Sequence, residues 1–295
     1  MPWLQLIIDT PPEAVEDLED ALLELGAQAV TLQDAADEPL FEPAPGEQPL
    51  WRDTRLVALL AADTDTAALE TALRARFPGG ILRALRVEPL EDRDWVRAWM
   101  EHFEPMRFGE RLWIVPGGFE APDPGALNIQ LDPGLAFGTG THPTTAMCLR
   151  WLDAHPPEGQ AVMDYGCGSG VLALAARLLG AASVIAVDTD PQALLATADN
   201  ARRNALEGIT PCLPEALDAE LDEPTVDLLL ANILAGPLHQ LAPRLATLVR
   251  PGGQLVLSGI LDSQAEALVS RYAPHFALAP FARQEEWVCL AGRRH

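Results

Sequence analysis

The stretch VMDYGCGSGVLALAA, residues 162–176, decides the fold of the larger part of this 295-residue chain. A short apolar run passes Asp164, three glycines then alternate with other residues at Gly166, Gly168 and Gly170, and a helical pattern begins at once. Glycine is needed where the backbone turns tightly or approaches a ligand. A helix that begins at Gly170 also points its free N–H groups and positive dipole end at any anionic group lying there. The stretch therefore predicts a strand, a ligand-binding turn and a helix, with a purely structural turn as the alternative.

Apolar runs alternate with helical stretches over the rest of the C-terminal part. Strands are expected at 161–166, 182–188, 226–233 and 252–260, with a weaker one near 209–213, and helices at about 170–179, 191–205, 237–249 and 264–272. This alternation is typical of an α/β protein with a doubly wound parallel sheet. Two final runs within 276–294 follow one another too closely for a crossover helix. The pattern predicts a seven-stranded sheet whose last strand is antiparallel.

An acidic residue closes the second strand of this sheet. The run SVIAVD ends at Asp188, 22 residues after Gly166. A carboxylate at that place can accept hydrogen bonds from ribose hydroxyls. The spacing G-x-G-x-G, with Asp164 two residues ahead, differs from the dinucleotide fingerprint G-x-G-x-x-G. The combination favours a nucleoside cofactor and disfavours a nicotinamide-dependent oxidoreductase.

The first 90 residues follow a separate pattern. Strands are expected at 3–9, 27–33, 54–62 and 81–90, and helices at 11–25 and 66–77. The order β-α-β-β-α-β is typical of a small ferredoxin-like α+β domain. After it, EDRDWVRAWMEHF carries aromatic residues at helical spacing. We therefore expect an N-terminal domain at 1–90, a linker helix at 91–104 and a cofactor-binding domain at 105–295.

Charge restricts the partners of the chain. It has 43 acidic and 20 basic residues, a formal net charge of −23, which would repel a phosphate backbone. Residues 1–90 hold 17 of the acidic residues and 6 of the arginines. The composition disfavours a nucleic-acid partner and favours a docking surface for something basic.

The cysteines and the N-terminus indicate a reducing compartment. Cys148, Cys167, Cys212 and Cys289 are far apart, with no C-x-x-C pair and no histidine at metal spacing, so neither a disulfide framework nor a metal site is expected. The N-terminus has no basic region and reaches Asp9 before a long apolar core, and no apolar run reaches about 18 residues. We expect a cytoplasmic protein without a membrane segment.

The motifs carry a resemblance to known families. D-x-G-x-G-x-G with an acid closing the next strand resembles the class I methyltransferases that bind S-adenosyl-L-methionine. The stretches PLEDRDWVRAWMEHFEPMRFGERLWI (89–114), LDPGLAFGTGTHPTTAMCL (131–149) and LLLANILAGPL (228–238) closely resemble the bacterial family that methylates the eleventh protein of the large ribosomal subunit. The likeness covers nearly the whole chain and is loosest before residue 85. It implies a Rossmann-like sheet, with the glycine turn (Gly166, Gly168) at the methionine moiety and Asp188 on the ribose.

The stretch 131–145 has the composition of a loop that closes over a ligand. Its glycines permit a change of shape, Phe137 could cover a ligand, and Thr145 could hydrogen-bond it. An irregular surface connection is the alternative. His142 could act as a general base, but a histidine before a proline is more often a turn residue.

Asn232 is the strongest candidate for a role in the chemistry. Related methyltransferases that act on nitrogen place Asn-Pro-Pro-Tyr or a similar sequence here, with a side-chain oxygen and carbonyls facing the methyl group. This chain has Asn-Ile-Leu-Ala at 232–235, a departure that favours an aliphatic amine over a planar amide or base. The resemblance implies methylation of lysine ε-amines and an N-terminal α-amine of a basic, lysine-rich ribosomal protein. Asn232 is expected to orient the amine and to contact the cofactor.

Several alternatives stay open at this point. A methyltransferase for another protein or a small amine, a nicotinamide-dependent oxidoreductase and a non-catalytic module that senses the cofactor all fit parts of the pattern. All 20 basic residues are arginine, which excludes a Walker-type P-loop and a Schiff-base lysine. Codon bias is one explanation for the absence of lysine, since arginine also keeps a surface charge. An enzyme that cannot methylate its own side chains is the second explanation.

Overall fold

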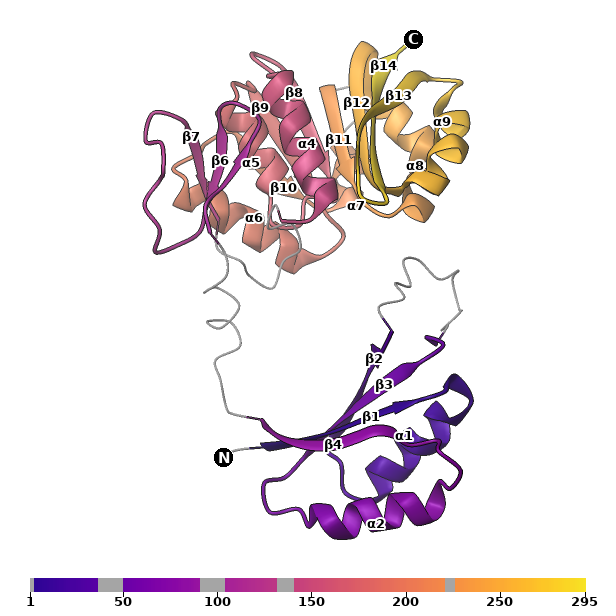
Figure 1. Cartoon of the computed structure of the whole chain (residues 1–295). Coiled ribbons are helices and arrows are strands. Elements are labelled where there is room, and N and C mark those ends of the chain that lie inside the picture. Colours follow the sequence, from indigo (N-terminus) through magenta and orange to yellow (C-terminus); the bar gives the residue numbers. More distant parts are fainter. Residues whose placement is uncertain (1–2, 37–49, 91–103, 132–140, 221–225) are drawn as a thin grey trace. The chain divides into compact units, whose positions relative to one another are not determined.

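The computed structural model describes residues 3–36, 50–90, 104–131, 141–220 and 226–295 (Figure 1). The chain divides into two compact units, Met1–Trp95 and Val96–His295. Apart from Glu104, the expected linker helix at 91–104 lies outside the described residues. Within the described ranges no helix has both the length and the apolar character needed to cross a membrane.

The first unit is a four-stranded antiparallel sheet with two helices (Figure 1). Its elements are β1 (Trp3–Thr10), α1 (Val15–Glu24), β2 (Ala29–Asp34), β3 (Thr54–Leu60), α2 (Thr66–Arg76) and β4 (Arg83–Leu90), with a 3-10 turn at Pro12–Ala14. The strand order is β2-β3-β1-β4, and the element order is the β-α-β-β-α-β expected from the sequence.

Both helices of this unit bury an apolar side against the sheet. Leu18 and Leu22 of α1 lie one turn apart and fully covered, and Leu73 of α2 joins them and the strand residues in one buried cluster. Asp65 begins α2, since its carboxylate accepts a hydrogen bond from Ala68 N at 3.0 Å. The cluster draws all its buried residues from this unit, which therefore has a core of its own.

The second unit opens with a small sheet and a helix that the sequence did not predict. The elements are β5 (Met106–Phe108), β6 (Leu112–Val115), β7 (Leu127–Gln130) and α4 (Pro143–Ala154). β5 pairs antiparallel with β6, and β6 pairs parallel with β7. Strands of three or four residues are too short to establish an alternating pattern.

The main sheet has seven strands in the order β10-β9-β8-β11-β12-β14-β13 (Figure 1). Its strands are β8 (Ala161–Tyr165), β9 (Ser183–Val187), β10 (Ile209–Cys212), β11 (Val226–Asn232), β12 (Val249–Leu261), β13 (Phe276–Gln284) and β14 (Trp287–Arg294). The strands from β10 to β12 are parallel, whereas β14 is antiparallel to both β12 and β13. The prediction of a doubly wound sheet with an antiparallel last strand is confirmed.

Helices cover both faces of this sheet. They are α5 (Val171–Leu178), α6 (Pro191–Arg203), α7 (Pro214–Glu220), α8 (Ala235–Leu248) and α9 (Ala265–Tyr272), in addition to α4. α4 and α5 contribute to one buried cluster, and α8 and α9 to a second. The buried strands separate the two clusters. Polar loops can therefore contact a ligand only at the ends of the strands.

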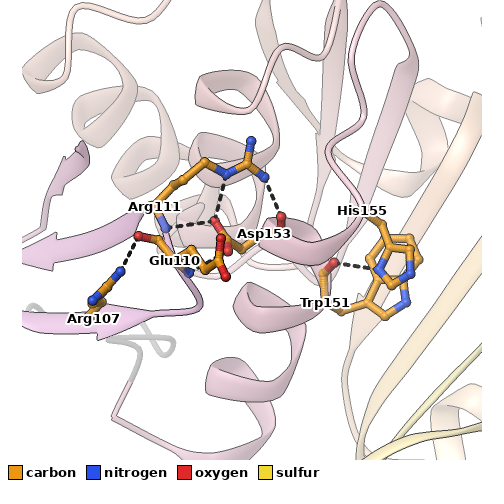
Figure 2. A network of polar contacts seen from close by, with 6 residues as sticks. All are labelled: Arg107, Glu110, Arg111, Trp151, Asp153 and His155. Carbon is orange, nitrogen blue, oxygen red and sulfur yellow. Dashed lines mark hydrogen bonds and ion pairs between the residues drawn. The ribbon is translucent and has the colours of Figure 1, made fainter. Parts of the chain in front are cut away.

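A buried carboxylate fastens α4 to the turn between β5 and β6 (Figure 2). Asp153, near the end of α4, is only 7% exposed. Its carboxylate accepts hydrogen bonds from Glu110 N at 2.7 Å and from Arg111 N and Nε at 3.2 and 3.3 Å. Arg111 Nη2 also donates to the Asp153 carbonyl. Gly109, at a φ of +70°, has no room for a Cβ beside this carboxylate, which explains the glycine in the turn.

Asp153→Asn is expected to lower the free energy of unfolding by about 1–3 kcal/mol, because an amide presents an NH₂ group to one of the donors and leaves it without a partner. Thermal and denaturant unfolding measure the loss. The matched control is Asp262→Asn, whose ion pair with Arg283 is exposed on both sides and should change stability by less than about 0.5 kcal/mol. Equal stability of the two variants would contradict this reading of the network.

Candidate functional site

The glycine turn after β8 folds against the end of β9. Gly166, Gly168 and Gly170 have φ of +84°, +53° and +80°, in the region where side chains are strained. The N–H groups of Gly166 and Cys167 both donate to the Val187 carbonyl, at 2.7 and 3.0 Å. The turn is therefore tied to the neighbouring strand at the carboxyl edge of the sheet.

Two of the three glycines make room for protein side chains. A Cβ on Gly166 would overlap the Ile233 side chain, which follows β11. A Cβ on Gly170 would lie 2.7 Å from Oγ1 and Cγ2 of Thr197, on α6. The sequence predicts that the glycines allow the backbone to approach a ligand closely. The structure shows in addition that Gly166 and Gly170 leave space for the side chains of Ile233 and Thr197.

The Asp188 carboxylate is held at the end of β9 by two backbone donors. Its Oδ2 accepts from Gly168 N at 2.9 Å, and its Oδ1 accepts from Asp190 N at 3.0 Å. The Asp190 side chain in turn accepts from Gln192 N at 2.8 Å and begins α6. One side-chain direction is thereby selected for Asp188, which is half-buried.

Asn232 ends β11 and is connected to α4. Its Nδ2 donates to Oγ1 of the buried Thr145 at 3.1 Å. The turn that follows passes close to β12, because Gly259 lacks the Cβ that would strike the Ile233 backbone. These contacts fix the end of β11 relative to both α4 and β12.

A cavity of about 820 Å³ collects the predicted site residues. Thr145, Gly166, Gly168, Asp188 and Asn232, which come from α4 and from the ends of β8, β9 and β11, all line it. Its volume lies within the range of small-molecule sites, roughly 300–1,000 Å³. The structure thus brings together these five residues that the sequence predicts for the cofactor site, whereas Phe137 and the rest of 132–140 lie outside the described residues.

The cavity also has walls that the sequence did not predict. Trp287, the first residue of β14, lines it together with His142, and their rings meet edge to face at a centroid distance of 5.0 Å. His142 begins α4, and its Nδ1 lies 2.7 Å from Thr144 Oγ1. His142 therefore has the contacts of a turn residue. No local motif points to Trp287, since only the antiparallel pairing of β14 brings it to this edge.

No group of three His, Cys, Asp or Glu side chains suited to a metal ion occurs within the described ranges.

Asp164, two residues before the glycine turn, is fully buried in β8. Its Oδ2 accepts from Ala173 N at 3.0 Å, and its Oδ1 has no hydrogen-bond partner among the described residues. Burial, opposed by the Ala173 N–H and aided by the charge of Asp188, raises the pKa of Asp164 to about 7.

Deprotonation of Asp164 should lower the free energy of unfolding as the pH rises. Its pKa is about 7 in the folded protein and about 4 in the unfolded chain, so between these values the folded state binds more protons. The contribution of protonated Asp164 to the free energy of unfolding is complete below about pH 4 and is lost by about pH 7. Asp164→Asn keeps an acceptor for Ala173 N without this titration, so its stability relative to the unmodified protein should rise by on the order of 2 kcal/mol from pH 5 to pH 8. Urea unfolding at both pH values measures this, and parallel pH profiles would refute the assignment.

Comparisons with known proteins agree with this architecture. A family model described as "Ribosomal protein L11 methyltransferase (PrmA)" matches residues 2–295. Proteins named "Ribosomal protein L11 methyltransferase" are 55% identical to this chain in Pseudomonas aeruginosa (strain LESB58), over 294 residues covering 100% of this chain and 99% of that protein, and in Azotobacter vinelandii, over 295 residues covering 100% of both.

A solved structure is similar as well. The crystal structure of a ribosomal protein L11 methylase from Lactobacillus delbrueckii subsp. bulgaricus has 33% sequence identity and a TM-score of 0.59, covering 65% of this chain and 100% of that one. The match of the family model over nearly the whole length and the identity of the relatives lead to one conclusion. The chain belongs to the ribosomal protein L11 methyltransferase family.

Proposed function

We propose that this chain transfers methyl groups from S-adenosyl-L-methionine to amines of ribosomal protein L11, the protein that its relatives' names specify. The observation that carries the proposal is the cavity at the carboxyl edge of the sheet, where the glycine turn, Asp188 and Asn232 meet. A nicotinamide-dependent oxidoreductase is disfavoured, because the chain belongs to a methyltransferase family.

The residues of the cavity fit this cofactor. Asp188, with its carboxylate already oriented by two N–H donors, would accept the ribose hydroxyls. The glycine turn and the N-terminus of α5 would hold the methionine end, and Thr145 and Asn232 line the same cavity. When bound, S-adenosyl-L-methionine supplies an electrophilic methyl group on a sulfonium.

The task of the protein is then to present a neutral amine. A lysine ε-amine has a pKa of about 10.4 in water, and an apolar wall lowers this value by desolvation. Leu172, Ile233 and Trp287 contribute such a wall. No strong base is needed, and His142 at the start of α4 is a capping residue in this mechanism.

Asn232 would aim the amine. Because its Nδ2 donates to Thr145, the plane of the amide is fixed, and the amide oxygen is the group that can accept a hydrogen bond from the substrate. Holding the reacting atoms in line contributes up to roughly 7–11 kcal/mol in favourable cases. The sequence Asn-Ile-Leu-Ala after β11 supports an aliphatic amine as the acceptor, on lysine side chains and at the N-terminus of the substrate.

The N-terminal unit would recognise the substrate. Residues 1–90 carry a formal charge of −11, about half of the charge of the chain on less than a third of its length. Such a surface attracts a basic, lysine-rich protein and repels free RNA. Among the described residues, those that line the cavity all belong to the second unit.

Asn232→Ala is expected to lower the rate of methyl transfer by about 10- to 100-fold, because orientation is lost near the transition state. Stability should change less, and some loss of cofactor affinity is expected. Single-turnover rates at saturating cofactor measure the effect. Gln192→Ala on α6 truncates an exposed amide outside the cavity and should leave the rate unchanged. An unaltered rate in the Asn232 variant would remove it from the mechanism.

Deleting residues 1–90 is expected to spare binding of S-adenosylhomocysteine while reducing methylation of intact ribosomal protein L11 by more than about 10-fold, through the loss of electrostatic steering and docking. Separate buried cores in the two units support folding of the shortened chain. Methylation of a short lysine peptide is the control and should change much less. Full activity on the intact substrate would place recognition in the catalytic unit.

A further inference from the structure

Side chains on a buried face of α6 donate hydrogen bonds to the backbone of the glycine turn. Thr197 is 0% exposed, and its Oγ1 donates to the Gly168 carbonyl at 3.1 Å. Asn200, one turn later on the helix and 8% exposed, donates from Nδ2 to the Ser169 carbonyl at 2.8 Å. Two consecutive carbonyls of the turn are therefore bound by side chains of one helix.

Gly168 is held on its other side by Asp188. The Gly168 N–H donates to Asp188 Oδ2, and the Gly168 carbonyl accepts from Thr197. A glycine at a φ of +53° has more conformational freedom than any other residue, so its orientation depends on such contacts. Two hydrogen bonds, one on each side of the Gly168 Cα, thus connect the Thr197 hydroxyl and the Asp188 carboxylate to the same residue.

We propose that Thr197 is a positioning residue for the cofactor, acting through Gly168 on Asp188. This inference rests on the proposed function of the cavity. Thr197 is not among the residues that line the cavity, so it acts without touching the ligand. Its hydroxyl orients Gly168, and Gly168 orients the carboxylate that receives the ribose.

The two ends of the Thr197 side chain have different tasks. The hydroxyl makes the hydrogen bond to Gly168 and also lies 3.4 Å from Cys167 Sγ, a weaker acceptor. Both the methyl group and the hydroxyl lie beside Gly170, each 2.7 Å from the position that a Cβ would take, and the methyl group contributes packing alone. Valine keeps the volume and loses the hydroxyl, whereas serine keeps the hydroxyl and loses the methyl group.

This difference separates positioning from packing. With isothermal titration of S-adenosylhomocysteine, Thr197→Val should raise Kd by about 5- to 10-fold, the equivalent of one lost hydrogen bond. Thr197→Ser should bind within about 2-fold of the unmodified protein, although the lost methyl group lowers its Tm by roughly 2–4 °C. A packing role predicts the reverse order of affinities.

A double-variant cycle tests the connection through Gly168. In an Asp188→Asn background, which should bind more weakly by itself, adding Thr197→Val should cost less than about 2-fold, because its effect passes through the Asp188 carboxylate. Three results would overturn the inference: an unchanged Kd in Thr197→Val, an equal increase in Kd in Thr197→Ser, or a double variant whose increase in Kd is the product of the increases in the two single variants. Failure of the unmodified protein to bind S-adenosylhomocysteine would instead refute the proposed function, and the inference with it.

Discussion

The hydrogen bonds between the turn after β8 and the end of β9 organise the rest of this site. Val187 O accepts two N–H groups of the turn, and Asp188 accepts a third. These contacts are possible because β8 and β9 are adjacent parallel strands whose carboxyl ends meet at one edge of the sheet. α5 starts from the turn, α6 supports it through Thr197 and Asn200, and the cavity lies where these elements converge.

The same arrangement would allow the proposed site to methylate an amine with the residues that the structure describes, none of which has to act as a strong base. Hydrogen bonds within the protein orient the polar groups of the cavity: backbone N–H groups orient Asp188, and Asn232 is oriented by Thr145. Under the proposed function, the apolar remainder of the cavity would favour the uncharged form of a lysine amine. Catalysis would then come mainly from position and desolvation, and the acidic N-terminal unit would attract a basic substrate.

Local patterns were sufficient to predict most of the main sheet, because β8, β9, β11 and β12 each contain a buried apolar run followed by a helical pattern. β10 has no buried residue and gives only a weak signal. Boundaries were less certain: β12 begins at Val249, three residues before the expected strand, and α8 begins at Ala235, two residues before the expected helix. The short strands β5–β7 leave no periodic signal. The expected loop residues around Phe137 and the linker helix lie outside the described residues.

The candidate site was predictable where a motif specifies it and unpredictable where only tertiary contact does. Asn232 is the last residue of β11, and Gly166, Gly168 and Asp188 lie just after the ends of β8 and β9, so topology alone places them together. Thr197 in α6 resembles any polar helix residue, and its role depends on which face is buried. Trp287 reaches the cavity only through the pairing of β14, a contact between distant parts of the chain.

The transfer of methyl groups to ribosomal protein L11 can be measured by mass spectrometry of ribosomal proteins after incubation with the enzyme and isotopically labelled S-adenosyl-L-methionine. The account predicts labelled methyl groups on lysine side chains and the N-terminal amine of ribosomal protein L11, and a strong reduction of that label with the Asn232→Ala variant. Label on another ribosomal protein, or none on L11, would contradict it.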